Sequence, residues 1–186
     1  REELRRVNVQ MNKQGMRVLA VAVKKDVHKE AVYSVEDEKE MTLIGFMGFL
    51  DPAKESAVSA IRSLHEHGVN VKVLTGDNDI VAKKVCKDVG IEVSHVLLGS
   101  QIEAMTDEEL RAQVEETNLF AKLNPMQKSK IIELLQAKGH TVGFMGDGIN
   151  DAPALRKADV GISVDTAADI TKDASSIILL EKSLNV

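Results

Sequence analysis

The 186-residue chain is 44% hydrophobic, so it can bury a core, and its length suggests one domain or slightly more. Only 3% of its residues are aromatic, so we expect an aliphatic core. A net charge of −5 argues against nucleic-acid binding, and no apolar run approaches the length of a membrane span. The single cysteine, Cys86, excludes an internal disulfide and suits a helix core better than a nucleophile. We therefore expect a soluble piece of protein.

The chain opens with the pattern of a helix and two strands. Apolar residues at helical spacing predict a helix over residues 1–13, which Gly15 ends. The apolar segments Arg17–Lys24 and Met41–Leu50 predict strands, with the acidic segment Tyr33–Glu40 as a hairpin tip or linker. Because residue 1 is an arginine within the helical pattern, we expect the chain to be a cut fragment.

The next segment predicts a helix and then a strand that ends in polar residues. Asp51 suits the N-cap of the helix, with Pro52 in its first turn. Val69–Leu74 is β-branched and predicts a buried strand, which Thr75-Gly76-Asp77 follows directly. Ligands bind at such strand ends in open α/β sheets, and a threonine hydroxyl beside helix N–H groups suits phosphate. An ordinary N-cap by Asp77 or Asn78 for the following helix explains the same residues.

The middle of the chain becomes less regular after Gly90 and then resumes its periodicity. Thr106 opens a short amphipathic helix, Leu119–Leu123 predicts a strand, and Pro125 starts a further helix. Lys128 lies in the first turn of that helix, where the helix dipole disfavours a cation unless an anion is present. Lys128 is therefore either a solvated side chain or an anion contact.

An acidic stretch between two apolar runs organises the remaining chain. Thr141–Met145 predicts a strand, and the glycines of the G-D-G that follows permit a sharp turn. Asp147 and Asp151 then converge beyond the strand end, with Asn150 between them. Two carboxylates and an amide oxygen form a suitable half-shell for Mg²⁺, which keeps waters and takes substrate phosphate oxygens as well. The alternative is an acidic turn without a metal.

Strands alternate with helices throughout, and this pattern predicts a parallel, three-layer α/β sheet. The last elements expected are a strand, a helix and a strand over Val160–Val164, Ala168–Ala174 and Ser176–Leu180. The candidate residues Thr75, Lys128 and Asp147 come from three separate strand-to-helix junctions. Such a sheet gathers its site from these junctions.

Several motifs together resemble a known family. Gly146–Leu155, G-D-G-I-N-D-A-P-A-L, resembles the hinge motif of P-type cation-transporting ATPases, within the haloacid-dehalogenase-like group of phosphoryl-transfer domains. Gly15–Ala22, the T-G-D at Thr75 and the P-x-x-K at Lys128 resemble three further motifs of that family. The amino-acid sequence of Val164–Ala174 most resembles that of the bacterial magnesium-transporting type.

The resemblance implies roles for the matching residues. It implies that Asp147 holds the catalytic Mg²⁺ and that Asp151 and Asn150 support the metal and the phosphate. It implies contacts to the phosphoryl group from Thr75, Gly76, Asp77 and Lys128, and contacts to nucleotide from Arg17 and Asp51. From the residues alone, Arg17 is equally well a strand-edge arginine in solvent.

The sequence also departs from the family pattern. Lys54 and Lys122 stand where the family usually has arginine, and lysine cannot reproduce a planar, bidentate contact. The family's nucleophile, the aspartate of D-K-T-G-T on a central strand, has no counterpart here. We therefore expect residues 1–40 to be the tail of a nucleotide-binding domain and residues 41–186 to be a Rossmann-like phosphorylation domain that lacks its nucleophile strand. Such a domain should be marginally stable, or its sheet should close around the gap.

The resemblance implies that the intact parent is an enzyme, an ATP-driven cation transporter, of magnesium in particular, that works through an aspartyl phosphate. It would use ATP and Mg²⁺, pass its cation through a membrane domain outside this chain, and place this part at the cytoplasmic face of the inner membrane. The fragment alone should be inactive. Two alternatives remain open: a soluble phosphatase of the haloacid dehalogenase superfamily and a non-catalytic regulatory domain.

Overall fold

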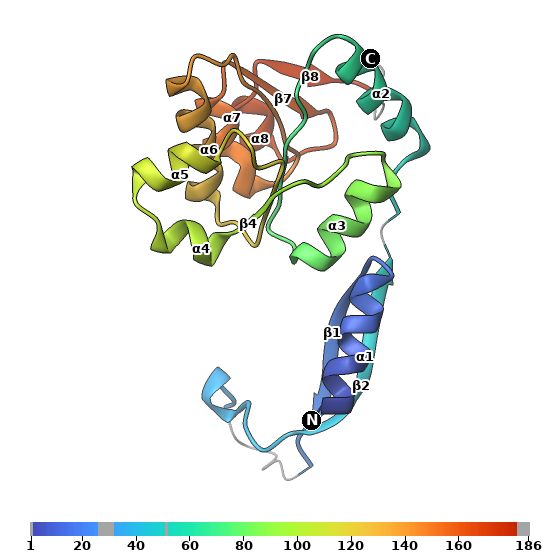
Figure 1. Ribbon diagram of the computed structural model, residues 1–186. Coiled ribbons are helices and arrows are strands. Elements are labelled where there is room, and N and C mark those ends of the chain that lie inside the picture. The colour runs from blue at the N-terminus through green and yellow to red at the C-terminus, as the bar shows by residue number, and fades with distance from the viewer. Residues whose placement is uncertain (1, 26–31, 51, 182–186) are drawn as a thin grey trace. The chain divides into compact units, whose positions relative to one another are not determined.

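The computed structural model describes residues 2–25, 32–50 and 52–181 (Figure 1). The chain forms two compact units, Arg1–Pro52 and Ala53–Val186. This division lies beyond the boundary expected at residues 40 and 41. The reason is that strand β2, Thr42–Leu50, pairs along its length with the strand before it and so belongs to the first unit.

The first unit is a helix on an antiparallel hairpin. Its elements are α1 (Glu2–Lys13), β1 (Met16–Val23), the short 3-10 helix η1 (Val35–Asp37) and β2. Helix α1 lies along the hairpin (Figure 1). It approaches the strand closely at Gly48, where an added Cβ would lie 2.7 Å from the Cε of Met11. The helix, strands and hairpin tip predicted for this segment are confirmed.

The second unit alternates helices with short strands. Its elements are α2 (Glu55–Glu66), β3 (Val73–Leu74), α3 (Asp79–Asp88), β4 (Val96–Leu98), α4 (Gly99–Ala104), α5 (Asp107–Gln113), β5 (Leu119–Ala121), α6 (Pro125–Ala137), β6 (Gly143–Met145), η2 (Ile149–Asp151), α7 (Ala152–Lys157), β7 (Val160–Val164), α8 (Asp169–Asp173) and β8 (Ile177–Leu179). Among the described residues, no helix has both the length and the apolar character needed to cross a membrane.

The strands of the second unit form two parallel sheets of three strands each, in the orders β3-β5-β4 and β6-β7-β8. The parallel α/β class predicted from the sequence is confirmed. The single continuous sheet is not observed, because β3 and β6 are edge strands that do not pair with each other within the described ranges. The sheet therefore does not close around a gap at this point.

Helices cover both faces of the first of these sheets. Leu119 and Phe120 are both fully buried, and they point to opposite faces because side chains alternate along a strand. Leu119 packs with residues of α2 and α3, including Cys86, whose burial raises the pKa of its thiol. Phe120 packs with residues of α4, α5 and α6. This arrangement is the expected three-layer architecture, and it places Cys86 in the core.

Two parts of the second unit differ from the sequence prediction. Helix α2 begins at Glu55, and its N-cap is Lys54, which has an extended backbone and no capping side chain. The N-cap of α2 is therefore Lys54 and not the predicted Asp51, which lies outside the described residues. Strand β4 and helices α4 and α7 were not predicted, because they are short and their apolar residues show no clear period.

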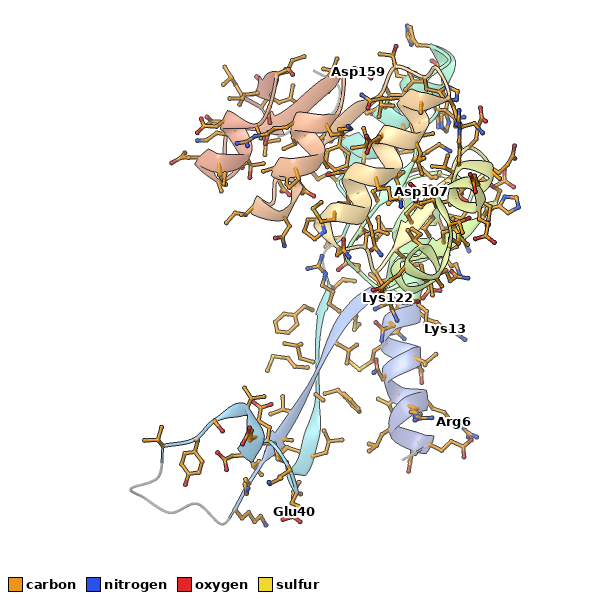
Figure 2. All side chains as sticks on the ribbon, turned by 90° about the vertical axis from the view of Figure 1, so that its left-hand side faces the viewer. Arg6, Lys13, Glu40, Asp107, Lys122 and Asp159 are labelled. Atoms are coloured by element: carbon orange, nitrogen blue, oxygen red, sulfur yellow. The ribbon has the colours of Figure 1, made fainter. Side chains whose placement is uncertain are left out.

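The strands of the two sheets run in a common direction. Lys122 directly follows the end of β5, whereas Asp159 directly precedes the start of β7. Figure 2 shows these two residues at opposite ends of the second unit. The carboxyl ends of β5 and β7 therefore face the same side, which is where ligands bind in α/β sheets.

Close packing at Gly161 leads to a stability prediction. A Cβ added to Gly161 would lie 2.6 Å from the carbonyl oxygen of Leu155, whereas one added to Gly143 in the neighbouring strand would lie 3.9 Å from its nearest atom. We expect Gly161→Ala to lower the free energy of unfolding by about 1–3 kcal/mol. Gly143→Ala should have little effect. Urea unfolding of both variants tests this, and equal stabilities would contradict it.

Asp159 leads to a prediction about pH. Its carboxylate accepts a hydrogen bond from Val142 N–H (2.8 Å), and this bond, with a weaker one from Gln136, lowers the pKa of Asp159. A lowered pKa in the folded state stabilises the protein above the unfolded pKa, near pH 4, and this stability is lost as pH falls through the folded value. We expect Asp159→Asn to lower the free energy of unfolding at pH 7. At pH 3 the difference in unfolding free energy between the variant and wild type, measured by urea unfolding, should be smaller. An equal difference at both values would refute this.

Candidate functional site

The T-G-D segment forms a tight turn at the end of β3. The hydroxyl oxygen of Thr75 accepts a hydrogen bond from Asp77 N–H (3.0 Å), while Thr75 N–H continues the sheet by donating to the carbonyl of Phe120 (2.9 Å). Asn78 caps helix α3 by accepting from Val81 N–H (3.0 Å). The predicted cap is therefore present at Asn78, and it leaves Thr75, Gly76 and Asp77 as a separate turn ahead of the helix.

This turn is bonded to the segment that leads into α6. Lys122 N–H donates to the carbonyl of Asp77 (2.8 Å), and Leu123 N–H donates to the carbonyl of Thr75 (3.0 Å). Lys122 has a φ of 54°, in the left-handed region that a lysine rarely adopts. Gly99 lets the backbone of Lys122 come close, because a Cβ on Gly99 would lie 2.3 Å from the carbonyl oxygen of Lys122. The ends of β3 and β5 are thus held side by side.

Helix α6 places Lys128 against an acidic partner. Asn124 and Gln127 form a reciprocal capping box at its start, with Pro125 in the first turn. The Nζ of Lys128 lies 2.7 Å from Oδ1 of Asp151, and the two side chains are only 12% and 14% exposed. The anion expected near this lysine is the carboxylate of Asp151. The alternative of a solvated Lys128 is therefore wrong.

Asp151 is held from two sides. Its Oδ1 takes the ion pair with Lys128, and its Oδ2 accepts from Gly148 N–H (3.2 Å). Gly146 lies directly against it, since an added Cβ would be 2.6 Å from the Cβ of Asp151. The glycine is needed for this close approach. The G-D-G turn thus folds around the Asp151 carboxylate.

Helices α6 and α7 are joined along their length by further polar contacts. Glu133 pairs with Lys157 (2.9 Å), and Gln136 donates to the carbonyl of Lys157 (3.0 Å). Helix α6 follows β5 in the first sheet, and η2 and α7 follow β6 in the second. The Lys128–Asp151 pair and these contacts therefore connect the two sheets.

The residues around Asp147 suit a magnesium ion that keeps part of its water shell. Asp147 and Asn150 are exposed, while Asp151 is partly buried. Within the described residues, no three His, Cys, Asp or Glu side chains form a cluster that could enclose a metal. Mg²⁺ is usually held by one or two carboxylates together with waters and substrate phosphates, so an exposed carboxylate beside an amide oxygen fits it. The donor set is compatible with Mg²⁺ and does not form a closed cage.

The two remaining candidate residues are Arg17 and Asp51. Arg17 is an exposed residue of β1, in the first unit, opposite Phe49 of β2. Asp51 lies outside the described residues. Within the second unit, the structure groups Lys128 with Asp151, and Thr75 with the segment that leads into α6.

Some supporting residues were missed from the sequence. Gly99 and Gln127 hold the segment before α6, since Gln127 donates to the carbonyl of Gly99 (2.8 Å). Ser163 is fully buried in β7 and donates to the carbonyl of Gly146 (2.9 Å). The alternation of small residues in V-G-I-S-V is a signal for close packing at Gly161 and Ser163 that could have identified this strand face.

The buried pair leads to a double-mutant prediction. Lys128→Met should lower the free energy of unfolding by about 3 kcal/mol, because it leaves the Asp151 carboxylate without a cation. The double variant Lys128→Met/Asp151→Asn should lose less unfolding free energy than Lys128→Met alone, because no unpaired charge then remains. Lys130→Met on the same helix is the control, since its pair with Asp107 is more exposed and should contribute less than about 1 kcal/mol. Additive losses at Lys128 and Asp151 would contradict the coupling.

Comparison with known proteins extends this picture. A family model described as haloacid dehalogenase-like hydrolase matches residues 5–159. The chain is 57% identical over 177 residues to "Magnesium-transporting ATPase, P-type 1" of Salmonella typhimurium (strain LT2), covering 94% of this chain and 20% of that protein. It is 52% identical over 184 residues to the protein of that name from Escherichia coli (strain K12), covering 99% and 20%.

A more distant relative is "Endoplasmic reticulum calcium ATPase srcA" of Aspergillus fumigatus, 33% identical over 192 residues and covering 96% and 20% of the two chains. The chain thus spans about a fifth of the length of these relatives. The predicted resemblance to P-type cation-transporting ATPases, and to the magnesium-transporting type in particular, is confirmed. With its parallel α/β sheets and its match over residues 5–159, the chain belongs to the haloacid dehalogenase-like hydrolase family.

Proposed function

We propose that this chain is the phosphate-handling part of an ATP-driven cation transporter that works through an aspartyl phosphate. The observation that carries the proposal is the largely buried pair of Lys128 and Asp151 beside the G-D-G turn. Phosphoryl transfer needs a lysine and, next to it, carboxylates that can hold Mg²⁺. A lysine and carboxylates at the ends of parallel strands meet this need. The similarity to transporting ATPases over 94% and 99% of the chain supports the same function.

We assign the first compact unit to the tail of a nucleotide-binding domain and the second to a phosphorylation domain. The assignment moves the boundary from residues 40 and 41 to Pro52, where the compact units divide. Arg17, exposed on β1, and Asp51 are the nucleotide contacts proposed for this part of the chain. The edges of β3 and β6 are where the nucleophile strand of the longer protein would pair.

Lys128 and Thr75 would bind the transferring phosphoryl group. The incoming phosphoryl oxygens would draw the Lys128 ammonium partly away from Asp151, which exchanges one charge-assisted hydrogen bond for another. The Thr75 hydroxyl, already oriented by Asp77 N–H, keeps its own proton free to donate to an oxygen of the group. Gly76 lets the backbone approach the phosphoryl group without a side chain in between.

Asp147, Asn150 and Asp151 would hold the metal. Mg²⁺, when bound, supplies positive charge that neutralises the transferring group. Asp147 is the exposed carboxylate and would be the direct ligand, whereas Asp151 would act from its hydrogen-bonded position behind it. The nucleophilic aspartate would come from outside this chain, because no D-K-T-G-T string occurs in the sequence.

The transported cation of the parent would be Mg²⁺. The chain is 52–57% identical to proteins described as magnesium-transporting and 33% identical to one described as a calcium ATPase. The parent would be a multi-pass membrane protein that carries this part on its cytoplasmic face and uses ATP as its phosphate donor.

The proposal predicts the effect of removing Asp147. In the full-length protein, Asp147→Ala should abolish the phosphoenzyme formed from labelled ATP, because the transferring charge would lose its metal. Asp173→Ala is the matched control, since Asp173 is an exposed acid at the last residue of α8 and should leave labelling within about twofold of wild type. Normal labelling of Asp147→Ala would refute the metal assignment.

The same assay separates the proposal from its alternatives. Labelling that is stimulated by a transported cation in membranes supports a transporter. Hydrolysis of a generic phosphate ester without membranes would instead favour a soluble phosphatase. A full-length protein that never takes up phosphate would favour a regulatory domain.

A further inference from the structure

Ser163 connects the interior of β7 to the G-D-G turn. Its side chain is fully buried, and its hydroxyl donates to the carbonyl oxygen of Gly146 at 2.9 Å. Gly146 is the residue just beyond the last paired position of β6, where Met145 lies opposite Ile162. The hydroxyl thus acts on the backbone where the sheet ends and the acidic turn begins.

The peptide groups of Gly146 are held on both sides. Gly146 N–H donates to the carbonyl of Ile162 (3.1 Å), which continues the ladder by one bond. The carbonyl of Gly146 belongs to the next peptide, which it shares with the nitrogen of Asp147, and Ser163 holds this peptide. Fixing a peptide plane fixes the direction in which the following residue leaves it. Ser163 therefore sets the starting orientation of Asp147.

The same glycine also determines where Asp151 lies. A Cβ on Gly146 would be 2.6 Å from the Cβ of Asp151, so a small rotation of this backbone would disturb the Asp151 carboxylate. Both carboxylates of the site thus depend on the position of a single glycine. A buried hydrogen bond to that glycine is a direct means of holding it.

We propose that Ser163 is a positioning residue for the proposed magnesium site, acting through the backbone of Gly146 and Asp147. The inference rests on the proposed function for the identity of the metal. Outer partners of this kind orient the groups that hold a metal and tune its affinity without touching it.

Thr171 provides a control for burial alone. Like Ser163, it is fully buried in the second unit, but its hydroxyl oxygen has no hydrogen-bond partner among the described residues. Thr171→Val keeps the shape of the side chain and removes a hydroxyl that makes no bond. If buried hydroxyls served stability alone, Ser163→Ala and Thr171→Val would change only the free energy of unfolding, and both would leave the acidic turn and the metal site unchanged.

The first test measures the loop directly, without metal or catalysis. Amide hydrogen exchange of the present chain should show Gly146 N–H exchanging about tenfold faster in Ser163→Ala, as expected for losing about 1.4 kcal/mol of local protection. The amide of Phe144, within the paired part of β6, should be unchanged. Thr171→Val should leave both amides as in wild type. Equal exchange at Gly146 in Ser163→Ala and wild type would overturn the proposal.

The second test measures magnesium in the full-length protein. The Mg²⁺ concentration for half-maximal phosphoenzyme formation should rise about tenfold or more in Ser163→Ala and stay unchanged in Thr171→Val. Ser163→Cys keeps a weak donor of similar size, so smaller shifts in the same quantities are expected even if the alanine variant is unstable. A wild-type protein that forms no phosphoenzyme would refute the proposed function, whereas a normal Mg²⁺ dependence of both Ser163 variants would refute this inference.

Discussion

The ion pair between Lys128 and Asp151 is the contact on which the arrangement of the second unit depends. The two residues come from helices that follow different sheets, and the sheets do not pair with each other among the described residues. Burying two charges is costly unless each keeps its hydrogen bonds, and here Asp151 keeps a second bond from Gly148. The pair therefore both connects the two sheets and keeps a lysine and a carboxylate ready at their carboxyl ends.

Small residues make this edge of the sheets possible. Gly146 admits the Asp151 side chain, and Gly99 admits the backbone of Lys122. In each case a methyl group would meet atoms closer than normal contact distances. The chain thus places backbone and polar groups where a larger side chain would separate them. This is the arrangement expected of a surface that must let a phosphoryl group approach the backbone.

Much of this architecture was predictable because its signals are local. The β-branched strands, the capping residues Asn78 and Thr106, and Pro125 in the first turn of α6 are encoded within a few residues. The parallel α/β class followed from their alternation. The start of α2 was mispredicted, because the helix begins at Glu55 after an extended Lys54 that makes no side-chain cap, and the local pattern of Asp51 and Pro52 did not indicate this start.

The contacts within the site were less predictable because they join residues far apart in the sequence. The position of Lys128 left open whether it is solvated or contacts an anion, and its pairing with Asp151 depends on how α6 packs on α7. The donor role of Ser163 likewise depends on the register of β6 and β7. Short elements such as β4 carry too few residues for a period to be recognised, and their positions are determined by the sheet they join.

The most direct measurement is the structure of the full-length protein trapped with Mg²⁺ and aluminium fluoride as a phosphoryl analogue. Our account predicts that the Lys128 ammonium lies within hydrogen-bond distance of the analogue while Asp151 remains beside it. It also predicts that a carboxylate oxygen of Asp147 ligates the metal. A structure in which Lys128 pairs with Asp151 alone, and the metal lies away from Asp147, would contradict the account.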